Sequence, residues 1–206
     1  MKINCIPLGH LEANCYVIEC EETKKAAVID PGGDPSEVIT YLKEKGLTLE
    51  YIIDTHIHMD HIAGNDSLRD ATGAKLLMHP LEAEMLNGPR PYFPPAMGFP
   101  AKFKEPDRLV EDGDVFEVGN IKFKVLHTPG HTRGGICLVT NGAVFTGDTL
   151  FNTSIGRSDF AGGNYEDLID SIKTKLLTLP DDTLVLPGHM GQSTIGYERK
   201  HNPFLR

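Results

Sequence analysis

The sequence predicts an α/β domain of four layers, α/β/β/α, in which two sheets pack face to face with helices outside. Apolar segments of strand length recur along the chain and are bounded by turn residues. Both halves run through strands before a helix, and in both halves polar residues that can bind metals follow a strand. Strands that are apolar along their whole length need cover on both faces, which this layering provides.

Length and composition set the limits of this prediction. The chain has 206 residues, 40% of them hydrophobic and 24% charged, so we expect one soluble domain over residues 1–206. We find no apolar run of membrane-spanning length and no secretory signal, and we expect a cytoplasmic protein. A formal net charge of −9 disfavours nucleic acid and anionic membranes as partners. The four cysteines form no C-x-x-C pair, so we expect buried, reduced thiols.

The first half of the chain predicts strands interrupted by helices. A helix over residues 34–46 has Asp34 as its N-cap, Pro35 in its first turn and Gly46 at its end. A second helix is expected over residues 62–71, and a short third one over 81–87. The predicted strands are residues 2–8, 14–19, 24–32, 49–56 and 74–79.

The second half is richer in strands. Asn141-Gly142 predicts a two-residue hairpin turn, and Asn164 predicts the N-cap of a helix over residues 166–179. Residues 88–108, rich in proline and aromatic residues, predict a loop that forms either the rim of a site or a surface excursion. The predicted strands are residues 115–118, 121–128, 135–141, 142–148 and, as the final strand, 183–189. The apolar face of the helix is formed by Leu168, Ile172, Leu176 and Leu179.

Residues 55–61, THIHMDH, hold three of the nine histidines of the chain. His56 and His58 are two apart and share one face of an extended segment. Asp60 and His61 follow where the chain should turn into a helix. The segment therefore presents two pairs of ligand-type side chains.

Three more residues of this kind follow apolar strands, each beside a glycine that permits close approach. They are His131 in TPGHT, Asp148 in FTGDT and His189 in LPGHM. A structural zinc needs four ligands, so seven candidates suit two ions better than one. Imidazoles and carboxylates without a thiolate match Zn²⁺, Fe or Mn²⁺. The pattern predicts a two-metal centre.

The H-x-H-x-D-H cluster with its distant histidine, aspartate and histidine resembles the metallo-β-lactamase superfamily. The stretches TPGHTRGG, FTGDTLF, IGRSDF and PGHMGQSTIGYERKHNPFL are most similar to small glyoxalase II-like proteins, the hydroxyacylglutathione hydrolases and their short relatives. The resemblance implies a metallo-β-lactamase-type sandwich without the C-terminal helical domain of full-length glyoxalase II. It also implies one metal bound by His56, His58 and His131, and a second bound by Asp60, His61 and His189, with Asp148 bridging.

The function implied is binuclear, metal-dependent hydrolysis of a small-molecule thioester, first of all a hydroxyacylglutathione such as S-lactoylglutathione. Two divalent ions are expected, zinc first, with iron or manganese as alternatives. A water that bridges two cations has a pKa lowered toward neutrality, so it supplies hydroxide to attack the thioester carbonyl. Asp60 is assigned to metal binding first and to orienting this water second.

Two further residues have alternative interpretations. Asp30 in VIDPGG either hydrogen-bonds a ligand histidine, which we favour, or caps a turn. Arg157 in GRSDF either contacts a substrate carboxylate or forms a salt bridge with an acid such as Asp159. His127 is expected to serve packing or hydrogen bonding.

Other activities remain as alternatives. Persulfide dioxygenases share the cluster and use one Fe(II), for which His56, His131 and Asp148 would form the two-histidine, one-carboxylate set. Hydrolysis of another ester or thioester is a second alternative. Metallo-β-lactamases commonly carry cysteine at the position of Asp148, which argues against antibiotic hydrolysis. The acidic charge argues against a nuclease, and seven ligands argue against a purely structural metal site.

Overall fold

The computed structural model describes residues 1–88 and 102–206. Contacts within the chain group it into two units. The first unit comprises residues 1–110 and 117–121, and the second comprises residues 111–116 and 122–206. The assignment of residues 1–206 to a single domain stays a prediction. Most of the loop predicted at residues 88–108 lies outside the described residues.

The first unit contains a six-stranded mixed sheet whose strands follow chain order. Its strands are β1 (Lys2–Leu8), β2 (Ala13–Cys20), β3 (Lys25–Ile29), β4 (Thr48–Ile53), β5 (Lys75–Met78) and β6 (Arg108–Leu109). The first three pair antiparallel, and β3 to β6 pair parallel. Its helices are α1 (Ser36–Lys45), α2 (Met59–Ile62), α3 (Asn65–Thr72) and α4 (Pro80–Met85). The five strands predicted in this half are confirmed as β1 to β5. Strand β6 was not predicted, and its first residue, Arg108, lies at the end of the stretch expected to be a loop.

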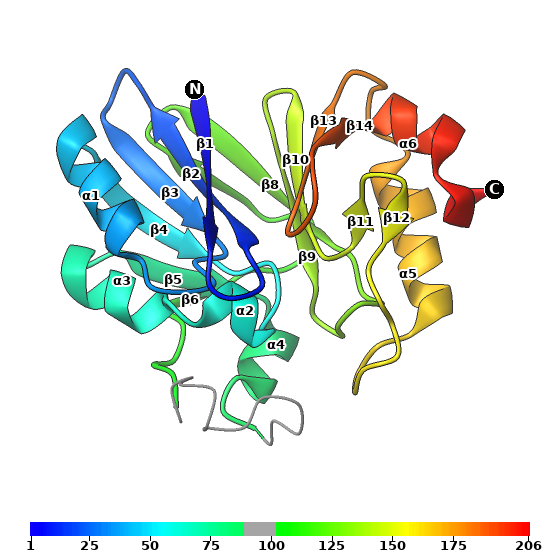
Figure 1. Cartoon of the computed structure of the whole chain (residues 1–206), viewed down its shortest axis with the longest axis horizontal. Helices are drawn as coiled ribbons and strands as arrows, with labels where there is room; N and C mark the ends of the chain where they lie inside the picture. The colour runs from blue at the N-terminus through cyan, green and yellow to red at the C-terminus, as the bar shows by residue number, and fades with distance from the viewer. Residues whose placement is uncertain (89–101) are drawn as a thin grey trace. The chain divides into compact units, whose positions relative to one another are not determined.

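Two helices, α1 and α3, lie along one face of this sheet (Figure 1). Val38 and Leu42 of α1 and Leu68 of α3 pack into a cluster with residues on one face of β2 to β5. The intervening strand residues, such as Ile18 and Ile53, are fully buried as well. Burial of both faces explains why these strands are mostly apolar.

The helix predicted over residues 62–71 is instead two helices, α2 and α3, separated at Gly64. The Gly64 N–H donates to the Pro31 carbonyl at 2.8 Å. A Cβ at Gly64 would lie 2.3 Å from the Gly33 carbonyl oxygen. The helix is interrupted because its backbone passes directly against the turn after β3.

The start of α1 also differs in detail from the prediction. Pro35 occupies the N-cap position, one residue later than expected. The Asp34 carboxylate accepts from the Ser36 N–H at 3.0 Å, so it still binds the first turn. Gly46 ends the helix as predicted, in a left-handed conformation (φ 62°).

The second unit contains most of the second mixed sheet, of order β14-β13-β10-β9-β8-β7. The strands are β7 (Val115–Val118), β8 (Ile121–His127), β9 (Ile136–Thr140), β10 (Ala143–Gly147), β13 (Leu184–Pro187) and β14 (Ser193–Thr194). Strands β10 and β13 run parallel, so both end at the same edge of the sheet. A small hairpin, β11 (Leu150–Phe151) with β12 (Ser154–Ile155), follows β10.

The long predicted helix of this unit is α5 (Tyr165–Ser171) continued by a π-helical segment (Ile172–Leu176). The Asn164 side chain caps it, as predicted, by accepting from the Glu166 and Asp167 N–H groups. Its apolar face packs on the sheet together with Ile195 of α6 (Ile195–His201), and Figure 1 shows both helices beside β11 and β12. A short 3₁₀ helix (Pro203–Leu205) ends the chain.

Residues 183–189 were expected to hold the final strand, but β14 follows β13 and pairs with it antiparallel. Two residues are too short a stretch to show alternation, so the sequence pattern missed this strand. Three of the four free cysteines are buried as expected, while Cys5 is exposed. Among the described residues, no helix is both long and apolar enough to cross a membrane.

Candidate metal centre

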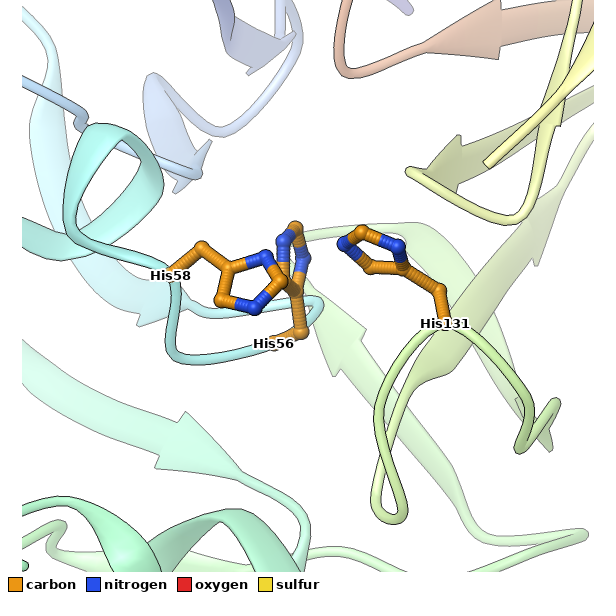
Figure 2. Close-up of side chains that lie close together, drawn as sticks. All are labelled: His56, His58 and His131. Carbon is orange, nitrogen blue, oxygen red and sulfur yellow. The ribbon is translucent and has the colours of Figure 1, made fainter. Parts of the chain in front are cut away.

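The first part of the site lies at the carboxyl ends of the parallel strands of the first unit. Strand β4 ends at Ile53, and His56 and His58 follow in the loop that leads to α2. Their rings lie with centroids 4.7 Å apart, almost perpendicular to one another. Figure 2 shows both side chains projecting from this loop. Met59, at the start of α2, is buried in the core of the unit.

Asp30 follows the neighbouring strand β3 and is 1% exposed. Its carboxylate accepts from the Thr55 N–H and from the Thr55 hydroxyl, both at 2.7 Å. The same carboxylate lies 3.0 Å from Nδ1 of His61. The interpretation that Asp30 holds a histidine of the cluster is confirmed.

These contacts determine which nitrogen each imidazole presents. The Thr55 hydroxyl gives its one proton to Asp30, so toward His56 Nδ1, 3.0 Å away, it can only accept. His56 therefore carries its proton on Nδ1, and so does His61, whose Nδ1 faces the Asp30 carboxylate. In both residues Nε2 is left as the ligating nitrogen, the usual arrangement behind a metal.

Asp60 and His61 both lie in α2 and are 9% and 0% exposed. Nε2 of His61 is 3.5 Å from a carboxylate oxygen of Asp60. Gly32 makes room for this helix, because a Cβ there would lie 1.5 Å from the Asp60 carbonyl oxygen. Ligand atoms of Asp30, His56 and His61 fall within 4.8 Å of one another, which shows how compact the cluster is.

Two buried acids behind the cluster were missed by the sequence analysis. Asp54, fully buried, accepts from the Asn65 amide at 2.7 Å. Burial, and secondarily the Asp30 carboxylate, raises the pKa of Asp54 well above its ordinary value. Glu82 of α4, also fully buried, accepts from the Ile57 N–H at 2.9 Å. An acid in an otherwise apolar strand end was the available signal for Asp54; we find none for Glu82.

In the second unit His131 lies in the turn after β8 and is 5% exposed. Its Nδ1 is 2.7 Å from the Arg157 carbonyl oxygen. A carbonyl can only accept, so His131 also carries its proton on Nδ1 and presents Nε2. Figure 2 shows the His131 side chain as sticks. Gly130 (φ 136°) lets the turn lie against the start of α5, where a Cβ would be 2.3 Å from the Leu168 backbone.

Asp148 and His189 follow the adjacent parallel strands β10 and β13, which brings them to one edge of the second sheet. One Asp148 carboxylate oxygen lies 3.6 Å from Nε2 of His131 and 3.8 Å from Nε2 of His189. The carboxylate therefore lies between the two imidazoles. The second unit thus gathers its three predicted ligands into a single cluster.

Arg157 forms the salt bridge that was one of its two interpretations. Its guanidinium donates two hydrogen bonds of 2.7 Å to Asp159 and stacks 3.7 Å from the centre of the Phe160 ring. The hydrogen bonds from Arg157 lower the pKa of the Asp159 carboxyl to about 2. The role of Arg157 in substrate binding stays a prediction. His127 hydrogen-bonds the Arg133 carbonyl, as expected of a structural residue.

The chemistry of these donors fits divalent transition metals. Clusters of imidazole and carboxylate, buried in the first unit and partly buried in the second, occur in both units, and three of the histidines are oriented through Nδ1. The compact ligand groups of the described residues contain no cysteine. This nitrogen and oxygen set is consistent with a binuclear site for zinc, iron or manganese.

Comparison with known proteins identifies the family to which the chain belongs. The family model described as the metallo-beta-lactamase superfamily matches residues 8–189. The chain therefore belongs to the metallo-β-lactamase superfamily, and its fold is the α/β sandwich of two mixed sheets flanked by helices that the sequence predicted. With its clusters of histidine and aspartate, it is a metal-dependent hydrolase of that superfamily.

Three relatives are informative. Hydroxyacylglutathione hydrolase GloC of Haemophilus influenzae is 38% identical, over 100% of this chain and 98% of the relative. The chain in the crystal structure of the BLEG-1 B3 metallo-β-lactamase is 38% identical in sequence to this chain. The two superpose with a TM-score of 0.91 over 99% of each chain. The crystal structure of TTHA1623 in a di-iron-bound form is 35% identical with a TM-score of 0.87, covering 98% of this chain and 100% of that one.

Proposed function

We propose that the protein is a binuclear thioester hydrolase that acts on a hydroxyacylglutathione such as S-lactoylglutathione. The observation that carries the proposal is the full-length likeness, at 38% identity, to hydroxyacylglutathione hydrolase GloC. The presence of all seven ligand-type residues supports the hydrolytic class. A solvent-exposed guanidinium at Arg157 offers a group that could recognise the carboxylates of a glutathione moiety.

The proposed ligands follow the superfamily pattern. His56, His58 and His131 would bind one ion, and Asp60, His61 and His189 the other, with Asp148 shared. Two observations support this assignment. His56, His61 and His131 all present Nε2, and the Asp148 carboxylate lies between Nε2 of His131 and Nε2 of His189. We expect zinc first, with iron or manganese as alternatives; the di-iron form of TTHA1623 makes iron a concrete one.

When bound, two divalent ions supply Lewis acidity and lower the pKa of a coordinated water. The residues of the chain hold the ligand side chains in place. Asp30, Thr55 and the Arg157 carbonyl hold three imidazoles in a fixed tautomer. In this proposal the Asp60 carboxylate orients the attacking water, and Arg157 contacts the substrate after releasing Asp159. No serine or cysteine nucleophile is needed for such a reaction.

Hydrolysis of β-lactams is the second candidate. The likeness to the BLEG-1 B3 metallo-β-lactamase is as high in identity as the likeness to GloC. An amide in a strained ring and a thioester present the same kind of carbonyl to an attacking water. An activity assay therefore decides whether the aspartate at position 148, where metallo-β-lactamases commonly carry cysteine, excludes β-lactam hydrolysis.

The deciding experiment is metal analysis of protein purified without added metal or chelator, with activity measured on the same sample. Hydrolysis of S-lactoylglutathione, hydrolysis of a chromogenic β-lactam and oxygen uptake with glutathione persulfide are compared. About two metals per chain with thioester turnover is the expected result. Turnover of the β-lactam alone would replace the thioester proposal. One iron per chain with oxygen uptake and no hydrolysis would favour a persulfide dioxygenase.

A further inference from the structure

A buried pair of residues in and directly after α6 is connected to the second-unit cluster through the β11–β12 hairpin. Glu198 of α6 is 0% exposed, and Asn202, directly after α6, is 1% exposed. One carboxylate oxygen of Glu198, Oε2, accepts from the Thr153 N–H and from the Asn202 side-chain amide, both at 2.9 Å. The Asn202 amide also donates to the Ser154 carbonyl at 2.9 Å. The turn of the hairpin is thus held by side chains from α6 and its end.

The hairpin turn needs contacts from outside the hairpin to keep its conformation. Thr153 has φ 55°, a left-handed conformation that a β-branched residue rarely adopts. Its N–H points to Glu198, so the hydrogen bond fixes the residue in this conformation. The hairpin itself has only two residues in each strand, too few to define its own geometry.

The two ends of the hairpin carry groups of the candidate site. Asp148 precedes β11, and Arg157 follows β12 and gives the carbonyl that accepts from His131 Nδ1. Between them Gly156 passes so close that a Cβ would lie 1.7 Å from the Asp148 carbonyl oxygen and 3.3 Å from His131 Nδ1. A shift of the hairpin would therefore move the carbonyl that orients His131.

We propose that Glu198, with Asn202, is a positioning residue that orients His131 by fixing the β11–β12 hairpin. The inference rests on the proposed function only where it concerns metal binding. Orientation of the imidazole is a property of the second unit and can be measured separately. Loss of partners that orient a ligand typically weakens metal binding about 10–100-fold.

The test compares three variants. Glu198→Leu removes both hydrogen bonds. Glu198→Gln keeps one oxygen, which can accept both hydrogen bonds in place of Oε2. Its amide nitrogen would take the position of Oε1, which makes no hydrogen bond among the described residues. Arg199→Leu is the matched control on the same helix, since Arg199 donates to the Leu177 and Leu179 carbonyls and not to the hairpin.

Two properties are measured for each variant. Zinc affinity is determined by competition with a chromophoric chelator, and the imidazole N–H resonances are recorded by ¹⁵N NMR after chelation. We expect Glu198→Leu to weaken zinc binding about 10–100-fold and to lose the protected His131 Nδ1–H signal. The His61 signal, held by Asp30 in the first unit, should persist. Glu198→Gln and Arg199→Leu should keep both properties near those of the wild type.

Wild-type affinity and an intact His131 signal in Glu198→Leu would overturn the inference. Equal losses in Arg199→Leu would also overturn it, because they would indicate general loosening of α6. If Glu198→Leu does not fold, Asn202→Ala removes the bond to Ser154 and should show the same loss of the His131 signal. A wild-type protein that binds no zinc would count against the proposed function, while the NMR signal would still decide the positioning role.

Discussion

At the scale of single residues, the Asp148 carboxylate is the group on which the proposed centre depends most. One of its oxygens lies within 3.8 Å of two imidazole nitrogens. As the ligand proposed to be shared by both ions, it should affect both when removed. We expect Asp148→Ala to lower metal content and to reduce hydrolysis by about 100-fold or more. Metal analysis and steady-state kinetics measure this, with Asp182→Ala as an exposed control. Full metal content at full rate would show that Asp148 is no bridge.

Arg157 allows a narrower test of substrate recognition. The Arg157 side chain is 54% exposed and is paired with Asp159, so its contribution to binding is reduced by solvent and by this partner. Arg157→Ala should raise KM for an anionic thioester by a few-fold, up to about 10-fold, without changing metal content. Asp159→Ala, which removes this ion-pair partner, should lower KM or leave it unchanged. Identical kinetics in all three proteins would return Arg157 to a structural role.

At the scale of elements, the break between α2 and α3 positions Asp60 and His61. Gly64 has helical dihedral angles (φ −89°, ψ −6°), so alanine meets no conformational barrier there. The added Cβ would nevertheless lie 2.3 Å from the Gly33 carbonyl oxygen. We expect Gly64→Ala to lower the free energy of unfolding by about 1–3 kcal/mol. Gly191→Ala, where a Cβ meets nothing within 4 Å, should be nearly neutral in the same denaturant titration. Equal stability of the two variants would contradict the steric explanation.

The same elements show what a sequence can and cannot reveal. Strands such as β2 and β4 were predictable because continuous apolar runs need burial on both faces. The cap at Asn164 was predictable because it acts through local hydrogen bonds. The break at Gly64 was not, because glycine is tolerated within a helix and the obstacle, Gly33, is remote in sequence. Strand β14 and the hairpin are only two residues per strand, which is too short for any periodicity.

The candidate site divides in the same way. Ligand-type residues could be found because each follows a strand and their types share one chemistry. The groups that hold these ligand-type residues in place could not be found from the sequence. Glu82 lies in α4, whose sequence, PLEAEM, is typical of any amphipathic segment, and it hydrogen-bonds a backbone N–H 25 positions away. The Arg157 carbonyl is part of the backbone, so the identity of residue 157 does not indicate that it orients His131.

At the scale of the whole molecule, acidic composition and the proposed centre make one joint prediction. The formal charge of −9 is offset in part when two divalent cations bind. Because the proposed ligand sets take residues from both units, bound metal should stabilise both against unfolding. Zinc at about 1,000 times its Kd would add about 4 kcal/mol to the free energy of unfolding. In a chain of this size that corresponds to a rise in Tm of about 10 °C.

Thermal unfolding of chelated and zinc-restored protein measures the rise in Tm, and hydrogen exchange locates it. Slower exchange should be seen around His61 in the first unit and around His131 in the second. Magnesium, which prefers oxygen ligands, serves as the control ion and should leave both properties unchanged. Protection confined to one unit would mean that only the cluster of that unit holds metal. An ion bound by residues of both units would stabilise both units and not one alone.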